Sequence, residues 1–226
     1  MSKEQNIIDY LSGFIKAERR ERLREILRQR TRHITVVLED IYQPQNASAV
    51  LRTCECLGIQ EIHVIENHHE YRLNPAVVQG ASKWIELAKH NRAGEDNTRA
   101  CIEHLRTRGY RIIAMDPAPG GKTPEQLDVS EKLALCFGSE EPGLSGTLQD
   151  LADDTVRIPL HGFTQSYNLS VSAAISLYSL VTTLRNSGVN WQLGAGDATG
   201  LYIKWLAQST PSGQQLLEDY LEQLEG

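Results

Sequence analysis

The stretch ITVVLEDIYQPQNASAVLRTCECLGIQEIHVI, residues 34–65, contains the repeating unit of the fold. The β-branched run 34–38 predicts a buried strand, and 61–65 predicts a second one. Between them the sequence predicts a helix over 47–57, with Asn46 as its N-cap. The apolar residues of this helix recur at i, i+3, i+4 and i+7, so one of its faces is buried. The unit therefore predicts neighbouring strands joined by a helix that covers them.

The alternation of strands and helices continues along the chain. Further strands are predicted near 84–88 and at 110–115, 133–137 and 155–158, and further helices near 75–80 and at 95–108, 145–152 and 168–187. This order predicts an α/β fold, a mainly parallel sheet with helices on both faces. Ligands of such sheets bind beyond the carboxyl ends of the strands. Four predicted loops occupy such places: 39–46, 115–126, 138–145 and 159–168.

We expect three parts in the 226-residue chain, a length that suits one domain with appendages or at most two small domains. Residues 1–30 form a basic N-terminal extension with a helix over 5–29. Residues 31–187 form the α/β domain. Residues 188–226 comprise a glycine-rich linker, 188–200, and a tail of one or two short helices. We expect the tail to pack or to dimerise rather than to form a site.

Charge is distributed unevenly over the chain. The net charge is −6, yet residues 16–33 hold eight Lys and Arg and three Glu, a local charge of +5. A basic segment on an acidic body can hold RNA phosphate locally. It can equally be a solvated helix with i,i+4 ion pairs, since Glu21 and Glu25 lie among the arginines. The segment alone leaves both interpretations open.

Several classes of protein are disfavoured by composition. The chain has no run of roughly 18 apolar residues and no signal-peptide pattern at its start, so we expect a cytoplasmic protein without membrane contact. We also expect no metal site, because Cys54 and Cys56 lie in a helical pattern without a CxxC or Cys/His cluster. The stretch GGKT (120–123) is not a P-loop, since Asp116 stands where that motif needs glycine.

Polar residues accumulate where the last helix is predicted to begin. Helix capping needs one or two polar side chains, yet six lie between 164 and 172: Thr164, Gln165, Ser166, Asn168, Ser170 and Ser172. Hydroxyls near a helix N-terminus can hold a carboxylate or a phosphate. Ser170 and Ser172 are interpreted as small helix-packing residues. On the earlier helix, Arg52 lies off the apolar face and, taken alone, is a solvent-facing arginine.

Three separate motifs, in the same order, resemble those of the SpoU/TrmH family of RNA ribose 2′-O-methyltransferases in the SPOUT superfamily. NASAVLRTCECLG (46–58) is similar to the family's N-x-S-A-x-x-R-T-x-x-x-x-G. FGSEEPGLS (137–145) is similar to G-x-E-x-x-G-[LV]-S. IPLHGFTQSYNLSVSAA (158–174) is similar to I-P-M-x-G-x-x-x-S-L-N-V-S-x-A, with Tyr167 in place of the usual leucine. The resemblance covers about residues 15 to 187 and leaves the tail unaligned.

The resemblance implies a fold with a deep C-terminal trefoil knot, an exception to the usual rules of chain topology. It also implies that the knot loops bind S-adenosylmethionine (AdoMet), mostly through backbone groups. Carried over to this sequence, the cofactor-binding positions are Met115, Gly138, Ile158, Leu160, Tyr167 and Leu169.

The resemblance further assigns catalytic or supporting roles to Arg52, Asn46, Glu140, Ser166 and Asn168. The family's arginine is sometimes described as a general base. Because arginine stays protonated in proteins, we expect Arg52 to grip the RNA phosphate and stabilise negative charge. That phosphate is then a candidate proton acceptor. We expect Ser166 to orient Arg52 or the phosphate, and Glu140 to fix its own loop or Asn46.

The basic extension and GASKW (80–84) resemble the family members that methylate a D-loop guanosine of tRNA. The expected partners are therefore tRNA and a second copy of the chain, since sites of this family draw on both subunits. The expected RNA-binding residues are Arg19, Arg20, Arg24, Arg28 and Lys83. Two rival functions remain, ribosomal RNA methylation and non-catalytic RNA binding. The short extension disfavours the first, and the intact motif residues disfavour the second.

Overall fold

A computed structural model describes residues 2–225. The first residue of the predicted N-terminal extension and the last residue of the predicted tail lie outside the described residues. The chain divides into two compact units. We call Thr31–Trp191 the sheet unit, and the two chain ends, up to Arg30 and from Gln192, the terminal unit. The ends of the chain, expected to be separate appendages, thus share one unit.

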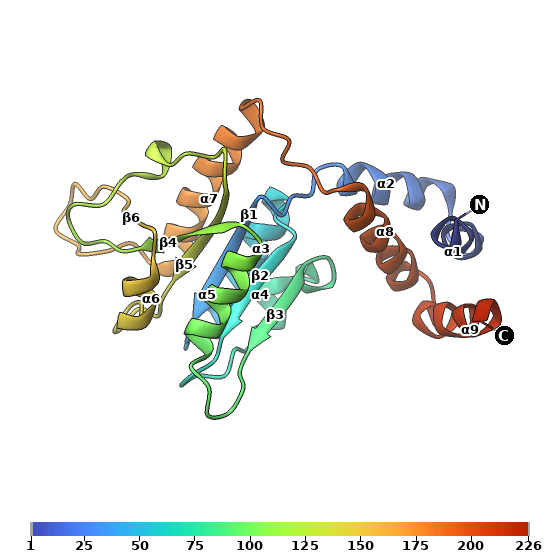
Figure 1. Ribbon diagram of the computed structural model, residues 1–226, viewed down its shortest axis with the longest axis horizontal. Helices are drawn as coiled ribbons and strands as arrows, with labels where there is room; N and C mark the ends of the chain where they lie inside the picture. Colours follow the sequence, from blue (N-terminus) through green and yellow to red (C-terminus); the bar gives the residue numbers. More distant parts are fainter. Residues whose placement is uncertain (1, 226) are drawn as a thin grey trace. The chain divides into compact units, whose positions relative to one another are not determined.

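The sheet unit is built on six strands, all paired in parallel, in the order β3-β2-β1-β5-β4-β6 (Figure 1). The strands are β1 (Ile34–Glu39), β2 (Glu61–Ile65), β3 (Glu86–His90), β4 (Tyr110–Met115), β5 (Lys132–Phe137) and β6 (Asp154–Val156). The predicted parallel sheet is confirmed. Because every strand runs the same way, all carboxyl ends lie along one edge, as the loop analysis requires.

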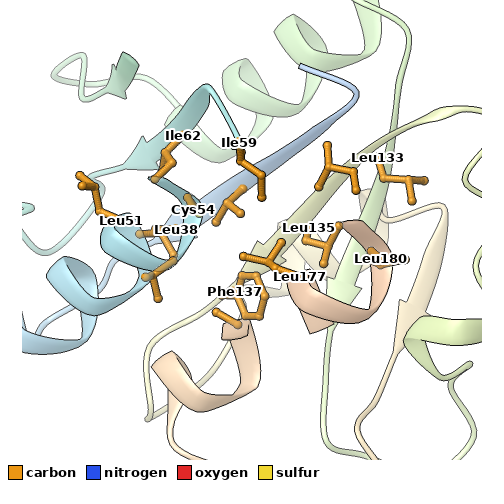
Figure 2. Packing of buried hydrophobic residues seen from close by; sticks show 14 of the residues in the cluster. Leu38, Leu51, Cys54, Ile59, Ile62, Leu133, Leu135, Phe137, Leu177 and Leu180 are labelled. Atoms are coloured by element: carbon orange, nitrogen blue, oxygen red, sulfur yellow. The ribbon is translucent and has the colours of Figure 1, made fainter. Parts of the chain in front are cut away.

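Helices cover both faces of this sheet. They are α3 (Pro44–Leu57), α4 (Pro75–Val78), α5 (Asn97–Thr107), α6 (Gly146–Leu151) and α7 (Leu169–Asn186), with short 3-10 turns η1 (Ala81–Lys83) and η2 (Pro124–Gln126). Leu38 and Leu135 pack with α3 and α7 in one apolar cluster, part of which Figure 2 shows. Val37 and Cys136, their neighbours in the strands, pack with α5 and α6 in a second cluster. Alternate strand residues therefore face opposite layers.

The terminal unit consists of α1 (Lys3–Ser12), α2 (Ala17–Leu27), α8 (Ala195–Ser209) and α9 (Gly213–Glu225). Trp205 is almost fully buried, and the guanidinium of Arg30 lies 5.3 Å from the centre of its ring. Leu23 is the one buried residue of α2, and the basic side chains of that helix other than Arg20 are exposed. Among residues 2–225, no helix combines the length and apolar content needed to cross a membrane.

Most predicted boundaries differ from the structure by two residues or fewer, as with β3, expected near 84–88, but three differ by more. The helix expected over 5–29 is interrupted at Gly13, whose N–H closes the end of α1. Helix α8 begins at Ala195, inside the expected linker, after Gly194 at its N-cap. Helix α3 begins at Pro44 rather than after Asn46, because proline favours the first turn, where a missing N–H costs nothing. Asn46 therefore lies inside the helix, and its amide is free for other contacts.

Glu39, at the end of β1, joins three elements below the carboxyl edge of the sheet. Its buried carboxylate accepts hydrogen bonds from the Thr98 hydroxyl of α5 at 2.5 Å, and from the backbone N–H and hydroxyl of Ser145 at 2.8 and 2.7 Å. Ser145 is the N-cap of α6, and its hydroxyl oxygen accepts a hydrogen bond from the N–H of Leu148. One side chain thus positions the loop between β5 and α6.

Replacing Glu39 by glutamine should lower the free energy of unfolding by about 1–3 kcal/mol, because an amide N–H₂ would face groups that already donate. Denaturant unfolding of Glu39→Gln measures the change. Glu103→Gln, on the exposed side of α5, is the control and should stay within about 0.5 kcal/mol of the parent. An unchanged midpoint for Glu39→Gln would show that this carboxylate does not hold the loop.

Candidate functional site

A cavity of about 270 Å³ opens at the carboxyl ends of β4, β5 and β6. Its lining comes from the end of β4, the loop after β5 and the segment from β6 into α7, together with Gln149 of α6. All six residues expected to bind the cofactor are on its wall: Met115, Gly138, Ile158, Leu160, Tyr167 and Leu169. In the sequence, these six positions were grouped only because of the family resemblance. In the structure, they surround one cavity.

The loop after β5 is shaped by a close backbone contact. A Cβ atom added to Gly138 would lie 2.2 Å from the carbonyl carbon of Gly143 and 2.3 Å from the N of Leu144. Real Cβ atoms do not approach backbone this closely, so glycine is required. Gly143 itself has a φ of 91°, a conformation that glycine adopts without strain. The loop therefore folds back onto the end of its own strand and forms one wall of the cavity.

A polar cluster at the rim links one residue from each of the three motifs. The side-chain Nδ2 of Asn46 donates to a carboxylate oxygen of Glu140. The side-chain Oδ1 of Asn46 accepts from Nδ2 of Asn168 at 3.2 Å. Asn46 is buried, so its polar atoms need such partners. Helix α3, the loop after β5 and the start of α7 are thereby held together.

Asn168 has a second role as the N-cap of α7. Its side-chain oxygen, Oδ1, accepts from the backbone N–H of Ser170 at 2.9 Å and from the Ser170 hydroxyl at 2.6 Å. Ser172 is on the cavity wall. The interpretation of Ser170 and Ser172 as packing residues was therefore incomplete, since one supports the cap and the other faces the cavity. Ser166 also lines the cavity.

Arg52 lies in a different place from the other expected catalytic residues. It lines a wide, mostly apolar hollow of about 1000 Å³ between α3 and α7, together with Ile175, Tyr178 and Glu125. Its guanidinium has one long contact, 3.5 Å to the carbonyl oxygen of Val77. Backbone and side-chain hydrogen bonds, the latter from Thr123 and Ser179, lower the pKa of Glu125, so that this hollow contains an ionised carboxylate. Within one chain, Arg52 and Ser166 line separate spaces.

The expected RNA-binding residues are divided between the two units. Arg19, Arg24 and Arg28 are exposed in or directly after α2. Arg20 is partly used for structure, because it donates to the carbonyl oxygen of Ser12 at 2.7 Å. Lys83 is exposed in η1 of the sheet unit.

Two residues near the site were missed by sequence reasoning. Arg157 lines the cavity, and its Nε is buried without a hydrogen-bond partner within residues 2–225. Glu39 fixes the loop that forms the cavity wall. Arg157 directly precedes the third motif, and an arginine at a strand end was the available signal. Glu39 carried no signal, because its partners come from distant parts of the sequence.

Comparisons with known proteins agree with this geometry. The SpoU rRNA Methylase family matches residues 33–178. A tRNA (guanosine(18)-2′-O)-methyltransferase of Borreliella burgdorferi is 42% identical over 201 residues, which cover 89% of this chain and 90% of that protein. The enzyme of the same name from Thermus thermophilus is 33% identical, covering 71% and 80%. The crystal structure of the A. aeolicus TrmH/SpoU tRNA modifying enzyme superposes with a TM-score of 0.75 at 26% identity, covering 85% and 96%.

The family match spans all six strands and all three motifs. The Borreliella relative extends the likeness over most of the chain. The site geometry and both kinds of comparison lead to one assignment: the chain belongs to the SpoU rRNA Methylase family.

Proposed function

We propose that this protein transfers a methyl group from AdoMet to the ribose 2′-oxygen of a tRNA guanosine, the D-loop nucleotide at position 18. The observation that carries the proposal is the cavity lined by the second and third motifs, with the cluster that ties the first motif to its rim. The names of the relatives support the substrate and the position. Modification of tRNA would place the protein in the cytoplasm.

The residues around the cavity suit AdoMet. Met115, Leu160 and Leu169 offer apolar contacts to the adenosine, while Glu140 and Arg157 match the cofactor's positive and negative groups. The volume of about 270 Å³ is close to the lower end of ligand pockets, roughly 300–1,000 Å³. Tyr167 is 41% exposed at this wall and would cover the cofactor with an aromatic ring where the family motif usually has leucine. When bound, AdoMet supplies a methyl group activated by its positively charged sulfur.

We also propose that the cavity wall is a trefoil knot, as the resemblance implies. Backbone hydrogen bonds from Lys122 to Thr155 at 3.0 Å, and from Arg157 to Lys122 at 2.8 Å, hold the 116–131 loop against β6. Directly after β6 the chain returns across the cavity to α7, and Glu125 of the same loop accepts from Ser179 of α7 at 3.0 Å. These contacts on both sides of the returning segment support a threaded chain.

In the reaction, the 2′-oxygen forms a bond to the methyl carbon as the carbon–sulfur bond breaks, and the 2′-OH proton is lost. The protein's task is alignment, which can contribute up to roughly 7–11 kcal/mol. Asn46, Glu140 and Asn168 keep the cavity wall in place. Arg52 binds the RNA phosphate and stabilises the negative charge on the oxygen. A phosphate oxygen accepts the proton.

The separation of Arg52 from the cavity supports a homodimer. Val171, Ile175 and Tyr178 form an exposed row on α7, beside the hollow that holds Arg52. A second copy packed on this row would bury apolar surface and could bring Arg52 to the partner's cavity. We propose that the active protein is this dimer, and that Arg19, Arg20, Arg24, Arg28 and Lys83 hold the tRNA outside the cavity.

The deciding experiment is incubation with labelled AdoMet and unmodified tRNA or ribosomal RNA, followed by nucleoside analysis. We expect 2′-O-methylguanosine in tRNA alone. Label in ribosomal RNA alone would establish the rival substrate. No incorporation, together with no AdoMet binding by calorimetry, would mean that the protein is not a methyltransferase.

Arg52→Lys should reduce turnover by about 100-fold or more. Lysine lacks the planar pair of donors with which arginine can bind a phosphate and a developing oxyanion. Single-turnover kinetics measure the loss, and filter binding should show nearly unchanged affinity for tRNA. If arginine acted as the base, lysine would retain much of the activity. Turnover near the parent rate would therefore contradict the phosphate role.

Gly138→Ala should abolish AdoMet binding in calorimetry, because the added Cβ cannot fit against Gly143 and the cavity wall must move. Gly146→Ala is the matched control, since no atom lies within 4 Å of a Cβ at that position in α6. The control should bind AdoMet like the parent. Equal binding by both variants would show that the cofactor does not use this wall.

A further inference from the structure

Two histidines and a cysteine converge on the sheet face that is covered by α5. His63 of β2 and His90 of β3 lie two register steps apart on adjacent parallel strands, since Ile65 is the register partner of His90. Cys101 lies on α5 above them. The Cys101 Sγ and one ring nitrogen of each histidine are all within 4.8 Å of one another. None of these three residues lines the cavity described above.

The spacing of the donor atoms matches a shared metal ion. Nδ1 of His63 and Nε2 of His90 are 3.2 Å apart. Ligands about 2.0–2.1 Å from a tetrahedral Zn²⁺ are separated from each other by roughly 3.3 Å. The two nitrogens therefore already have the separation that one ion requires, and the Cys101 Sγ lies within 4.8 Å of both.

The other nitrogen of His63 faces a carboxylate. Its Nε2 lies 3.6 Å from Oε2 of Glu61, and Arg108 holds that carboxylate through an Nη2 contact of 2.6 Å. His63 is fully buried, and its Nε2 has no hydrogen-bond partner within residues 2–225. A ligating histidine commonly gives its other N–H to a carboxylate, which fixes the ring and strengthens the ligand. Glu61 is placed to take this N–H after a small shift.

One side of the group is open to solvent. The ring of exposed His104, one turn after Cys101 on α5, has its centre 5.8 Å from that of His63 and 6.0 Å from that of His90. An ion can approach the group past this exposed ring. A hydrogen-bonded histidine pair, with Glu61 facing Nε2 of His63, would account for the 3.2 Å contact, but it would not explain why the Cys101 thiol converges on the same two ring nitrogens.

We propose that His63, His90 and Cys101 bind one Zn²⁺ ion, which fastens α5 to the β2–β3 edge of the sheet. Two imidazoles and a thiolate are the donors that zinc prefers. This site departs from the expectation of no metal. Its ligands come from three elements without a short-spacing motif, so the cysteine spacing carried no sign of it.

The test uses untagged full-length protein, stripped of metal by chelation and titrated with Zn²⁺ or Co²⁺. We expect one equivalent of zinc per chain by elemental analysis. We expect cobalt to give the strong visible bands of tetrahedral coordination and a near-ultraviolet thiolate band. His90→Ala, at the sheet edge, and Cys101→Ala should weaken binding by about tenfold or more. Cys101→Ala should also lose the thiolate band.

Cys54→Ala is the matched control, because Cys54 is an equally buried cysteine in the apolar cluster on the opposite face. It should bind the metal like the parent. Circular dichroism of each metal-free variant shows whether it has folded. Absence of stoichiometric binding by the parent would overturn the proposal, as would unchanged cobalt spectra in folded His90→Ala.

Discussion

The parallel pairing of β1 with β5 is the contact on which the rest of the site depends. In this register Leu38 is the partner of Phe137, so the next residues, Glu39 and Gly138, emerge side by side at the carboxyl edge. Glu39 then holds the far end of the loop that Gly138 begins, through Ser145. Because the first motif follows β1 and the second follows β5, this one pairing joins two motifs that are nearly a hundred residues apart.

The sequence could predict the elements of the sheet, but not their order. Runs such as 34–38 are mostly β-branched and apolar and contain no charged residue, as is typical of strands buried on both faces. The order β3-β2-β1-β5-β4-β6 arises from long-range packing, which the local periodicity of apolar residues does not reveal. The N-cap of α3 illustrates a local competition: Asn46 suits a cap, yet Pro44 suits the first turn and starts the helix earlier.

The site was partly predictable for a similar reason. An excess of polar residues before α7 signalled more than capping, and Asn168 indeed caps the helix while it also bonds to Asn46. What periodicity could not supply is the partner of each polar group. Glu39 bonds to Ser145, 106 positions away, and His63 contacts His90, 27 positions away, so no short motif contains either pair. Arg157 directly precedes the third motif, but its place on the cavity wall comes from the fold.

The layer formed by α3 and α7 leaves Arg52 and an apolar row exposed on its outer side. On the α3–α7 face, the apolar cluster fixes two helices whose outer sides carry Arg52 and the exposed row of Val171, Ile175 and Tyr178. Within its own chain, Arg52 does not line the cofactor cavity. If Arg52 acts in catalysis, it must therefore reach the cavity of another copy. A second copy that covers the apolar row would satisfy both needs at once. The catalytic role of Arg52 and the homodimer are therefore one hypothesis, and a monomeric active enzyme would remove the physical basis for both.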